Sequence, residues 1–210
     1  MWGLIIKGGP LMFLILMCSI IAVAVIIEKI WHLRRAEINT GLFMEDISKT
    51  LRRNKIVNAI DKCNAMPGPI AHIVKAGILK HDRGRSEIKE AIEDAGLHEI
   101  PRLEKNLGIL ATIAHISPLL GLLGTVTGMV RAFQVIEQKS VSLVPVNPGD
   151  LAGGIWEALI TTVAGLAVAI PAYVAYNFLV SKVDGFVLEM EKSATDLVNV
   201  LGAKREENEV

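Results

Sequence analysis

The sequence predicts an all-α integral membrane protein with three transmembrane helices, and three observations lead to this fold class. Hydrophobic residues make up 51% of the 210-residue chain and charged residues only 21%, and the mean hydropathy is +0.45. A soluble domain is usually about a quarter charged. The charged residues are absent from three windows, residues 8–27, 106–130 and 158–181. At ~1.5 Å per residue, each window can cross a hydrocarbon core of ~30 Å, and no strand-like alternation competes with this interpretation.

The three windows divide the chain into six segments. We expect a short outer N-terminus and first transmembrane helix (1–31), a cytoplasmic helical segment (32–105), a second transmembrane helix (106–131), an outer loop (132–150), a third transmembrane helix (151–181) and a cytoplasmic helical tail (182–210). The first apolar run is longer than a signal-peptide core of roughly 7–15 residues, and no clear cleavage site follows, so we interpret it as a retained anchor.

The distribution of basic residues predicts the orientation. Residues 29–105 hold fifteen Lys and Arg and the tail holds four, against three on the other side of the membrane. Basic residues favour the cytoplasmic side, which predicts a periplasmic N-terminus and a cytoplasmic C-terminus.

Charge and cysteine content exclude several classes of protein. The net charge is zero, so we expect no nucleic-acid partner, and the two cysteines form neither a disulfide framework nor a metal-ligand cluster. The charged middle segment is small and contains no glycine-rich phosphate-binding loop. We therefore expect no enzymatic activity, no cofactor and no metal.

The cytoplasmic tail carries an apolar heptad seam that predicts packing against other helices. Its apolar residues alternate at spacings of four and three: Val183, Val187, Met190, Ala194, Leu197 and Leu201. The seam follows the third window with only Gly185 as a helix-weakening residue, which predicts one long helix and an oligomer interface. No breaker precedes Asn106 either, so the second span is also expected to extend inward.

Glu157 is the most informative single residue. If Asp150 caps the third helix, Glu157 lies two turns inside it, near the outer leaflet. An ionisable side chain there is costly and is a functional hypothesis by default. Arg131 lies at a comparable depth in the second span. Two alternatives stay open: Glu157 faces a hydrated pore, or it forms an ion pair with Arg131.

Several neutral polar residues also lie within the spans. Counting from the middle of each span places Thr125 and Thr162 within ~2 Å of the same depth, and Thr161 lies one turn from Glu157. These threonines are candidates for a proton-pathway lining, although such hydroxyls also bond to helix carbonyls or link helices. His115 is a candidate relay that could instead bond to a neighbouring helix. Gly124-x-x-x-Gly128 is typical of close helix packing.

Long ordered motifs resemble the MotA/TolQ/ExbB proton-channel family, in particular its ExbB/TolQ branch, almost from end to end. The matching stretches are Lys7-Gly-Gly-Pro10, Ile27-Glu-Lys29, 118–128 (PLLGLLGTVTG), 131–133 (RAF), 151–162 (LAGGIWEALITT) through Pro171, and Tyr176-Asn177. A fourth span and a much longer cytoplasmic domain are absent, which disfavours a flagellar stator.

The resemblance implies a homopentamer in the bacterial inner membrane, with the second and third spans lining a central pore. It also implies single-span partners of the ExbD/TolR kind, each bringing a membrane aspartate, and a TonB/TolA-like protein beyond them. By position, Thr125 and Thr162 match the family's pore threonines and Glu157 matches its pore glutamate. His115 departs from the small or uncharged residue that is usual there.

These observations favour a proton-channel or motor subunit that uses the proton motive force to drive its partner for outer-membrane transport or envelope maintenance. The spans carry no midplane carboxylate or lysine, so another chain must supply the central titrating group. The alternative is a non-conducting membrane scaffold. A solute transporter is disfavoured because internal repeats and broken helices are not evident.

Overall fold

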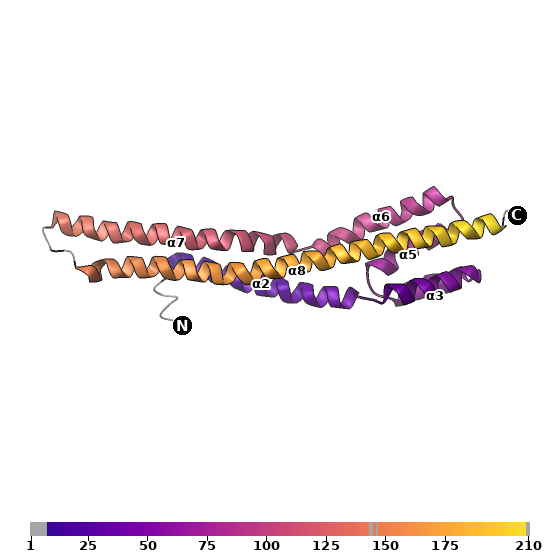
Figure 1. Ribbon diagram of the computed structural model, residues 1–210, viewed down its shortest axis with the longest axis horizontal. Helices are drawn as coiled ribbons and strands as arrows, with labels where there is room; N and C mark the ends of the chain where they lie inside the picture. Colours follow the sequence, from indigo (N-terminus) through magenta and orange to yellow (C-terminus); the bar gives the residue numbers. More distant parts are fainter. Residues whose placement is uncertain (1–7, 143–144, 146, 209–210) are drawn as a thin grey trace. The chain divides into compact units, whose positions relative to one another are not determined.

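The computed structural model describes residues 8–142, 145 and 147–208, and all regular secondary structure within them is helical (Figure 1). Lys7 of the first family-like motif lies outside these residues. The helices, in chain order, are α2 (Gly9–Ala36), α3 (Thr40–Arg52), α4 (Ile56–Ala65), α5 (Pro69–Leu79), α6 (Arg85–Glu104), α7 (Leu107–Val141) and α8 (Pro148–Asn208).

Helices α2, α7 and α8 contain the three apolar windows and are long enough to cross a membrane. This confirms the predicted all-α class with three long apolar helices. Helix α8 has 61 residues without interruption, as its uninterrupted sequence pattern predicted.

The second span does not continue inward as one helix, and that expectation was wrong. Helix α6 ends at Glu104 and α7 begins at Leu107. Between them Asn106 adopts the left-handed conformation, with φ of 66°. Asparagine is one of the few residues with a side chain that tolerates this region, so a helix can end there without glycine or proline. The Asn106 side chain then donates to Glu28 on α2 at 2.7 Å.

The connection between α7 and α8 is shorter than the expected loop of residues 132–150. Helix α7 stays helical as far as Val141, and α8 begins at Pro148. Asp150 is not the N-cap but lies in the first turn of α8, where its carboxylate accepts from the Asn147 amide at 2.8 Å and from Lys139 at 2.6 Å. A carboxylate that reaches back to the residue before the helix supplies one half of a capping box.

The chain divides into two compact units. One, here called the apolar unit, comprises residues 8–28 and 106–178, and the other, the charged unit, comprises residues 29–105 and 179–208. The apolar unit contains most of the three spans, and the charged unit contains α3 to α6 with the C-terminal part of α8.

In the apolar unit, α7 and α8 run antiparallel and meet along small residues, here called the small-residue seam. A Cβ on Gly128 would lie 2.6 Å from the Gly154 carbonyl oxygen and 2.9 Å from the Ala158 Cβ, and one on Gly124 would overlap the Thr161 side chain. The seam comprises Ser117, Gly121, Gly124, Gly128 and Ala132 on α7 and Gly154, Ala158, Thr161 and Gly165 on α8. Small residues at these spacings let the two backbones touch.

The charged unit has a conventional apolar core, which also buries the cation of Lys29. Lys29 is 1% exposed, and its Nζ donates to the carbonyl of Leu103 at 2.9 Å and to that of Arg102 at 3.5 Å. The last carbonyls of a helix lack partners within the helix and carry its negative dipole end. Lys29 therefore caps the C-terminus of α6, a role that its place at the end of an apolar run did not reveal.

Substitution of Gly128 by alanine tests the small-residue seam. The new methyl group meets backbone atoms of α8, so the helices must separate, and we expect a loss of about 1–3 kcal/mol in unfolding free energy. Gly153→Ala is the matched control, because a Cβ there meets no atom within 4 Å. Thermal unfolding in detergent measures both variants. Equal midpoints would contradict the close approach of α7 and α8.

Candidate functional site: an ion pair and threonine hydroxyls between two membrane helices

Arg131 on α7 and Glu157 on α8 form an ion pair in the apolar unit. Arg131 Nη1 donates to both carboxylate oxygens of Glu157, at 2.6 Å for Oε2. The Glu157 side chain is 15% exposed in the chain, and that of Arg131 is 51% exposed. In the structure Glu157 is therefore paired with Arg131, which is one of the two alternatives that the sequence left open.

The small-residue seam explains why this pair forms. Gly128 and Ala132, on either side of Arg131 in sequence, contact Gly154 and Ala158, which flank Glu157 in the same way. With the backbones this close and antiparallel, the two side chains need to span only a short gap. An intramembrane carboxylate must be paired, neutralised or hydrated, and here the guanidinium supplies two hydrogen bonds.

The hydroxyls of Thr125, on α7, and Thr162, on α8, both bond to carbonyls on one short stretch of α7. The Thr125 hydroxyl donates to the carbonyl of Leu122 at 2.6 Å within α7. The Thr162 hydroxyl reaches from α8 to the carbonyl of Gly121 at 3.1 Å, and also lies 3.2 Å from the Ala158 carbonyl. Carbonyls of successive helical residues differ by ~1.5 Å along the axis, so the two hydroxyls occupy neighbouring levels. Both threonines are half-buried.

Thr161 has a different environment from the other two threonines. It is 1% exposed and packs against Gly124, and its hydroxyl bonds to carbonyls of its own helix, those of Glu157 and Ala158, each at 2.9 Å. A side chain enclosed by α7 and α8 of its own chain does not line a surface. The prediction that Thr161 lines the proton pathway is therefore corrected, because Thr161 packs in the small-residue seam beside Glu157.

His115 lies on the exposed surface of α7. Its Nδ1 is 2.7 Å from the carbonyl of Ala111 in the same helix, and its ring meets that of Tyr173 on α8 edge to face, with centroids 6.3 Å apart. If Nδ1–H donates to the carbonyl, Nε2 keeps its lone pair. Its role as a relay stays a prediction.

The described residues include no group of three or more His, Cys, Asp or Glu side chains arranged to hold a metal ion. Both cysteines are free thiols. Burial raises the pKa of the Cys63 thiol to about 11, although the charge of Lys75 opposes the shift. The thiol is therefore protonated at neutral pH, where it is a poor nucleophile and a poor metal ligand.

The heptad seam of the tail is largely covered by the chain itself. Val183, Met190, Leu197 and Leu201 are 2%, 4%, 1% and 6% exposed, and Leu197 fits over Gly77 of α5. The periodicity thus describes mainly packing within the charged unit, because α5 and α6 provide apolar neighbours that sequence spacing could not identify. Val187 and Ala194 stay only half-buried.

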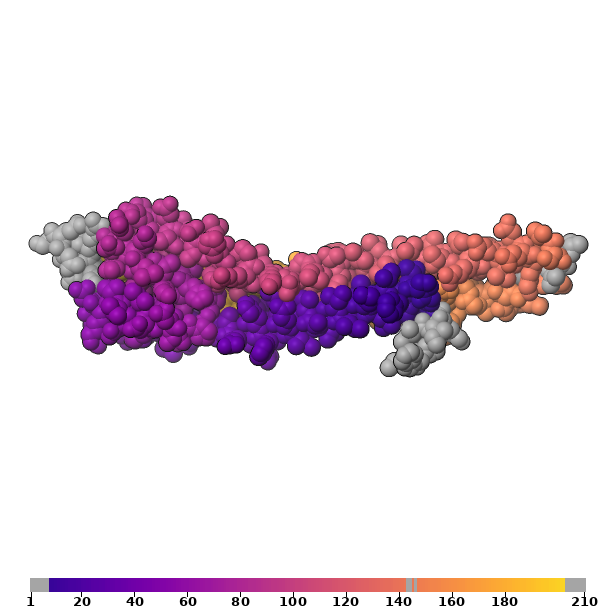
Figure 2. All heavy atoms as spheres, turned by 180° about the vertical axis from the view of Figure 1, so that it is seen from behind, coloured from indigo at the N-terminus to yellow at the C-terminus, as the bar shows by residue number. Residues whose placement is uncertain are grey.

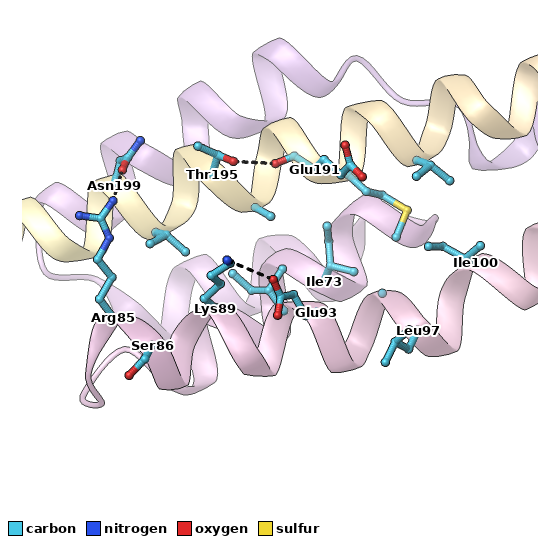
Figure 3. Close-up of a pocket in the computed structure, with 16 residues that line it drawn as sticks. Ile73, Arg85, Ser86, Lys89, Glu93, Leu97, Ile100, Glu191, Thr195 and Asn199 are labelled. Atoms are coloured by element: carbon cyan, nitrogen blue, oxygen red, sulfur yellow. Dashed lines mark hydrogen bonds and ion pairs between the residues drawn. The ribbon is translucent and has the colours of Figure 1, made fainter.

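An apolar groove of about 1060 Å³ lies between α6 and the C-terminal part of α8 (Figure 3). Its wall includes Leu97, which is 70% exposed, as well as Met190 and the half-buried Val187 and Ala194. Polar side chains pair with one another around it, Lys89 with Glu93 and Arg85 with Asn199. The sequence did not reveal this surface, since α6 carries no clear heptad of its own.

Comparison with known proteins identifies the family. The chain belongs to the MotA/TolQ/ExbB proton channel family, whose model matches residues 65–192, more than half of the chain. An ExbB homologue of Methanothermobacter thermautotrophicus is 29% identical over 88% of this chain, which spans 64% of that relative. The biopolymer transport protein ExbB of Neisseria meningitidis is 29% identical over 94% of this chain and 96% of its own.

A solved structure shares the fold. The MotAB structure of C. jejuni aligns with a TM-score of 0.65 at 16% identity, over 90% of this chain and 76% of that one. The family and the three long apolar helices indicate an inner-membrane protein of the ExbB/TolQ branch.

Thr162→Val and Thr125→Val separate the two kinds of threonine hydrogen bond. Valine keeps the shape and removes the hydroxyl. Thr162→Val loses a bond between helices and should lower the unfolding free energy by about 0.5–1.5 kcal/mol. Thr125→Val loses only a bond within α7 and should cost less. Thermal unfolding of both purified variants measures this, and an equal or larger loss for Thr125→Val would contradict the bridging role of Thr162.

Proposed function

We propose that this chain is the channel-forming subunit of an ExbB/TolQ-like complex that converts the proton motive force into movement of a single-span partner. The Arg131–Glu157 pair beside the Thr125 and Thr162 hydroxyls carries the proposal, because it places two charged groups and two hydroxyls on a pair of helices whose spans are mostly apolar. Family membership supports the same function. The proposal includes no catalysed reaction and no cofactor.

The partner has to supply the central titrating group. Residues 107–130 and 158–181 contain no Asp, Glu, Lys or Arg. A chain of hydroxyls and one outer carboxylate cannot carry a proton through ~30 Å of hydrocarbon alone. We propose that an ExbD/TolR-like protein provides a membrane aspartate, and that a TonB/TolA-like protein transmits the movement. Each proton that crosses 100 mV releases ~2.3 kcal/mol, so several protons are needed for each mechanical step.

We also propose a homopentamer with a periplasmic N-terminus and a cytoplasmic C-terminus, as the family resemblance and the basic residues of the charged unit suggest. The groove between α6 and α8 would then receive a neighbouring subunit. Leu97 supports this placement. It is exposed and lies beside the half-buried Val187 and Ala194, so together they form an apolar surface that a single chain leaves open to contact.

A non-conducting scaffold is the second candidate, and one observation favours it. Every threonine hydroxyl discussed above donates to a carbonyl of the chain, and Glu157 is bound to Arg131. Such satisfied groups stabilise a helix pair without any proton movement. Proton flux distinguishes the two functions directly.

Glu157→Gln and the double variant Arg131→Gln/Glu157→Gln test the role of the carboxylate. If the carboxylate serves conduction, both variants should assemble and both should lose proton flux in liposomes that also contain the ExbD/TolR-like partner. If the pair only holds α7 and α8 together, the double variant removes both charges at once and should keep its flux. Full flux in the double variant, or in the wild-type chain without any partner, would reject the proposed mechanism.

Leu97→Glu tests the oligomer surface. A charge in an apolar groove that a neighbour covers would be buried without a partner, so we expect smaller species in place of the pentamer in native mass spectrometry. Val57→Glu is the matched control, since Val57 on α4 is also 70% exposed but does not line the groove. An unchanged pentamer in Leu97→Glu would exclude the groove. Changes at Met190 or Leu197 are less informative, because both are buried within the chain.

A further inference from the structure

The first turn of α2 contributes a third element to the ion pair. In the apolar unit the start of α2, in indigo in Figure 2, lies against the salmon-coloured α7. A Cβ built on Gly9 would overlap Glu157 Oε1, and would lie 3.3 Å from Glu157 Cδ and 3.5 Å from Arg131 Nη1. Gly9 thus presents bare backbone to the carboxylate on the side of the Arg131 guanidinium.

Two independent constraints require glycine at this position. The first is conformational: Gly9 has φ of +65°, a region that residues with a side chain rarely adopt, and it precedes Pro10, which disfavours the right-handed helical region. The second is spatial: any side chain would occupy the volume of the Glu157 carboxylate. The positive φ would favour glycine wherever α8 lay. The spatial constraint, in contrast, exists only because Glu157 lies beside Gly9.

We propose that Gly9 is a positioning residue for Glu157. By lacking a side chain it lets the start of the first span seat against the carboxylate and keeps that carboxylate on Arg131. The pair is then held by three helices, since α7 provides the cation, α8 the anion and α2 the wall behind them. Movement of the carboxylate toward Gly9 would displace the start of α2.

The contact gives the first span a role that is separate from lining a pore. Arg131 is half-exposed, while Glu157 is mostly covered, so α2 is part of what covers the carboxylate. A change in the pair during conduction would reach α2 directly. This consequence for conduction rests on the proposed function, but the positioning contact itself does not.

A double-mutant cycle between Gly9→Ala and Glu157→Asp tests the proposal on the purified full chain in detergent. Gly9→Ala should lower the thermal midpoint by roughly 5–10 °C. Glu157→Asp withdraws the carboxylate by about one carbon–carbon bond, roughly 1.5 Å, and so makes room for a methyl group. The double variant should therefore recover at least half of the midpoint lost in Gly9→Ala. Gly149→Ala, near the start of α8 with no atom within 4 Å of the new Cβ, is the control for an added methyl.

Recovery is the informative readout, because strain from the positive φ would not be relieved by a shorter side chain on another helix. Additive losses in the double variant, or an unchanged midpoint in Gly9→Ala, would overturn the proposal. If Gly9→Ala cannot be purified in a folded form, recovery of folded protein in the double variant supports the contact, and failure to recover it rejects the contact.

Proton flux in liposomes with the ExbD/TolR-like partner separates this inference from the proposed function. We expect flux to fall in Gly9→Ala and to return in part in the double variant. A cycle that shows recovery of stability, together with unaltered flux in every variant, would establish the positioning contact and count against the proposed role of the Arg131–Glu157 pair in proton conduction.

Discussion

The direct contact between the backbones of α7 and α8 is the constraint on which the candidate site depends. In a bilayer the lipid tails are as apolar as leucine, so helices gain little from simple burial and associate mainly through close packing and hydrogen bonds. Gly121, Gly124 and Gly128 allow that approach, and a Cβ at any of them would meet α8. The approach fixes the register of the two helices. That register places Arg131 opposite Glu157 and brings the Thr162 hydroxyl to the Gly121 carbonyl.

The ion pair shows how such a scaffold accommodates charge. Within an apolar span, removing Arg131 would leave the mostly covered Glu157 without a partner for its charge, so the pair is costly to disturb even where its net contribution is small. Glu157 is mostly covered while Arg131 is half-exposed, which makes the guanidinium the side of the pair that another chain can reach. A partner that competes for either group would change the packing of α7, α8 and the start of α2 together.

The charged unit uses different physics, because its helices have an ordinary apolar core. Leu197 of α8 packs over Gly77 of α5, and Lys29 ends α6 by donating to its last carbonyls. Contacts within the charged unit bury most of the apolar face of the C-terminal part of α8. The groove beside Leu97 is one apolar surface that these contacts leave exposed, and Lys89 and Glu93 pair with each other at its wall. Association of chains would use this remainder and not the whole heptad.

The sequence by itself determined the helical class, the three spans, the unbroken α8 and the residues that carry charge and hydroxyls within the spans. Hydropathy and period suffice for these because they are local properties. It could not decide between a free and a paired Glu157, the enclosure of Thr161, the break at Asn106 or the internal use of the heptad seam. Each of these depends on which helix lies opposite, and side chains distant in sequence set that choice. Gly9 is the clearest case, since only its contact with a carboxylate 148 positions further along the chain gives it a role.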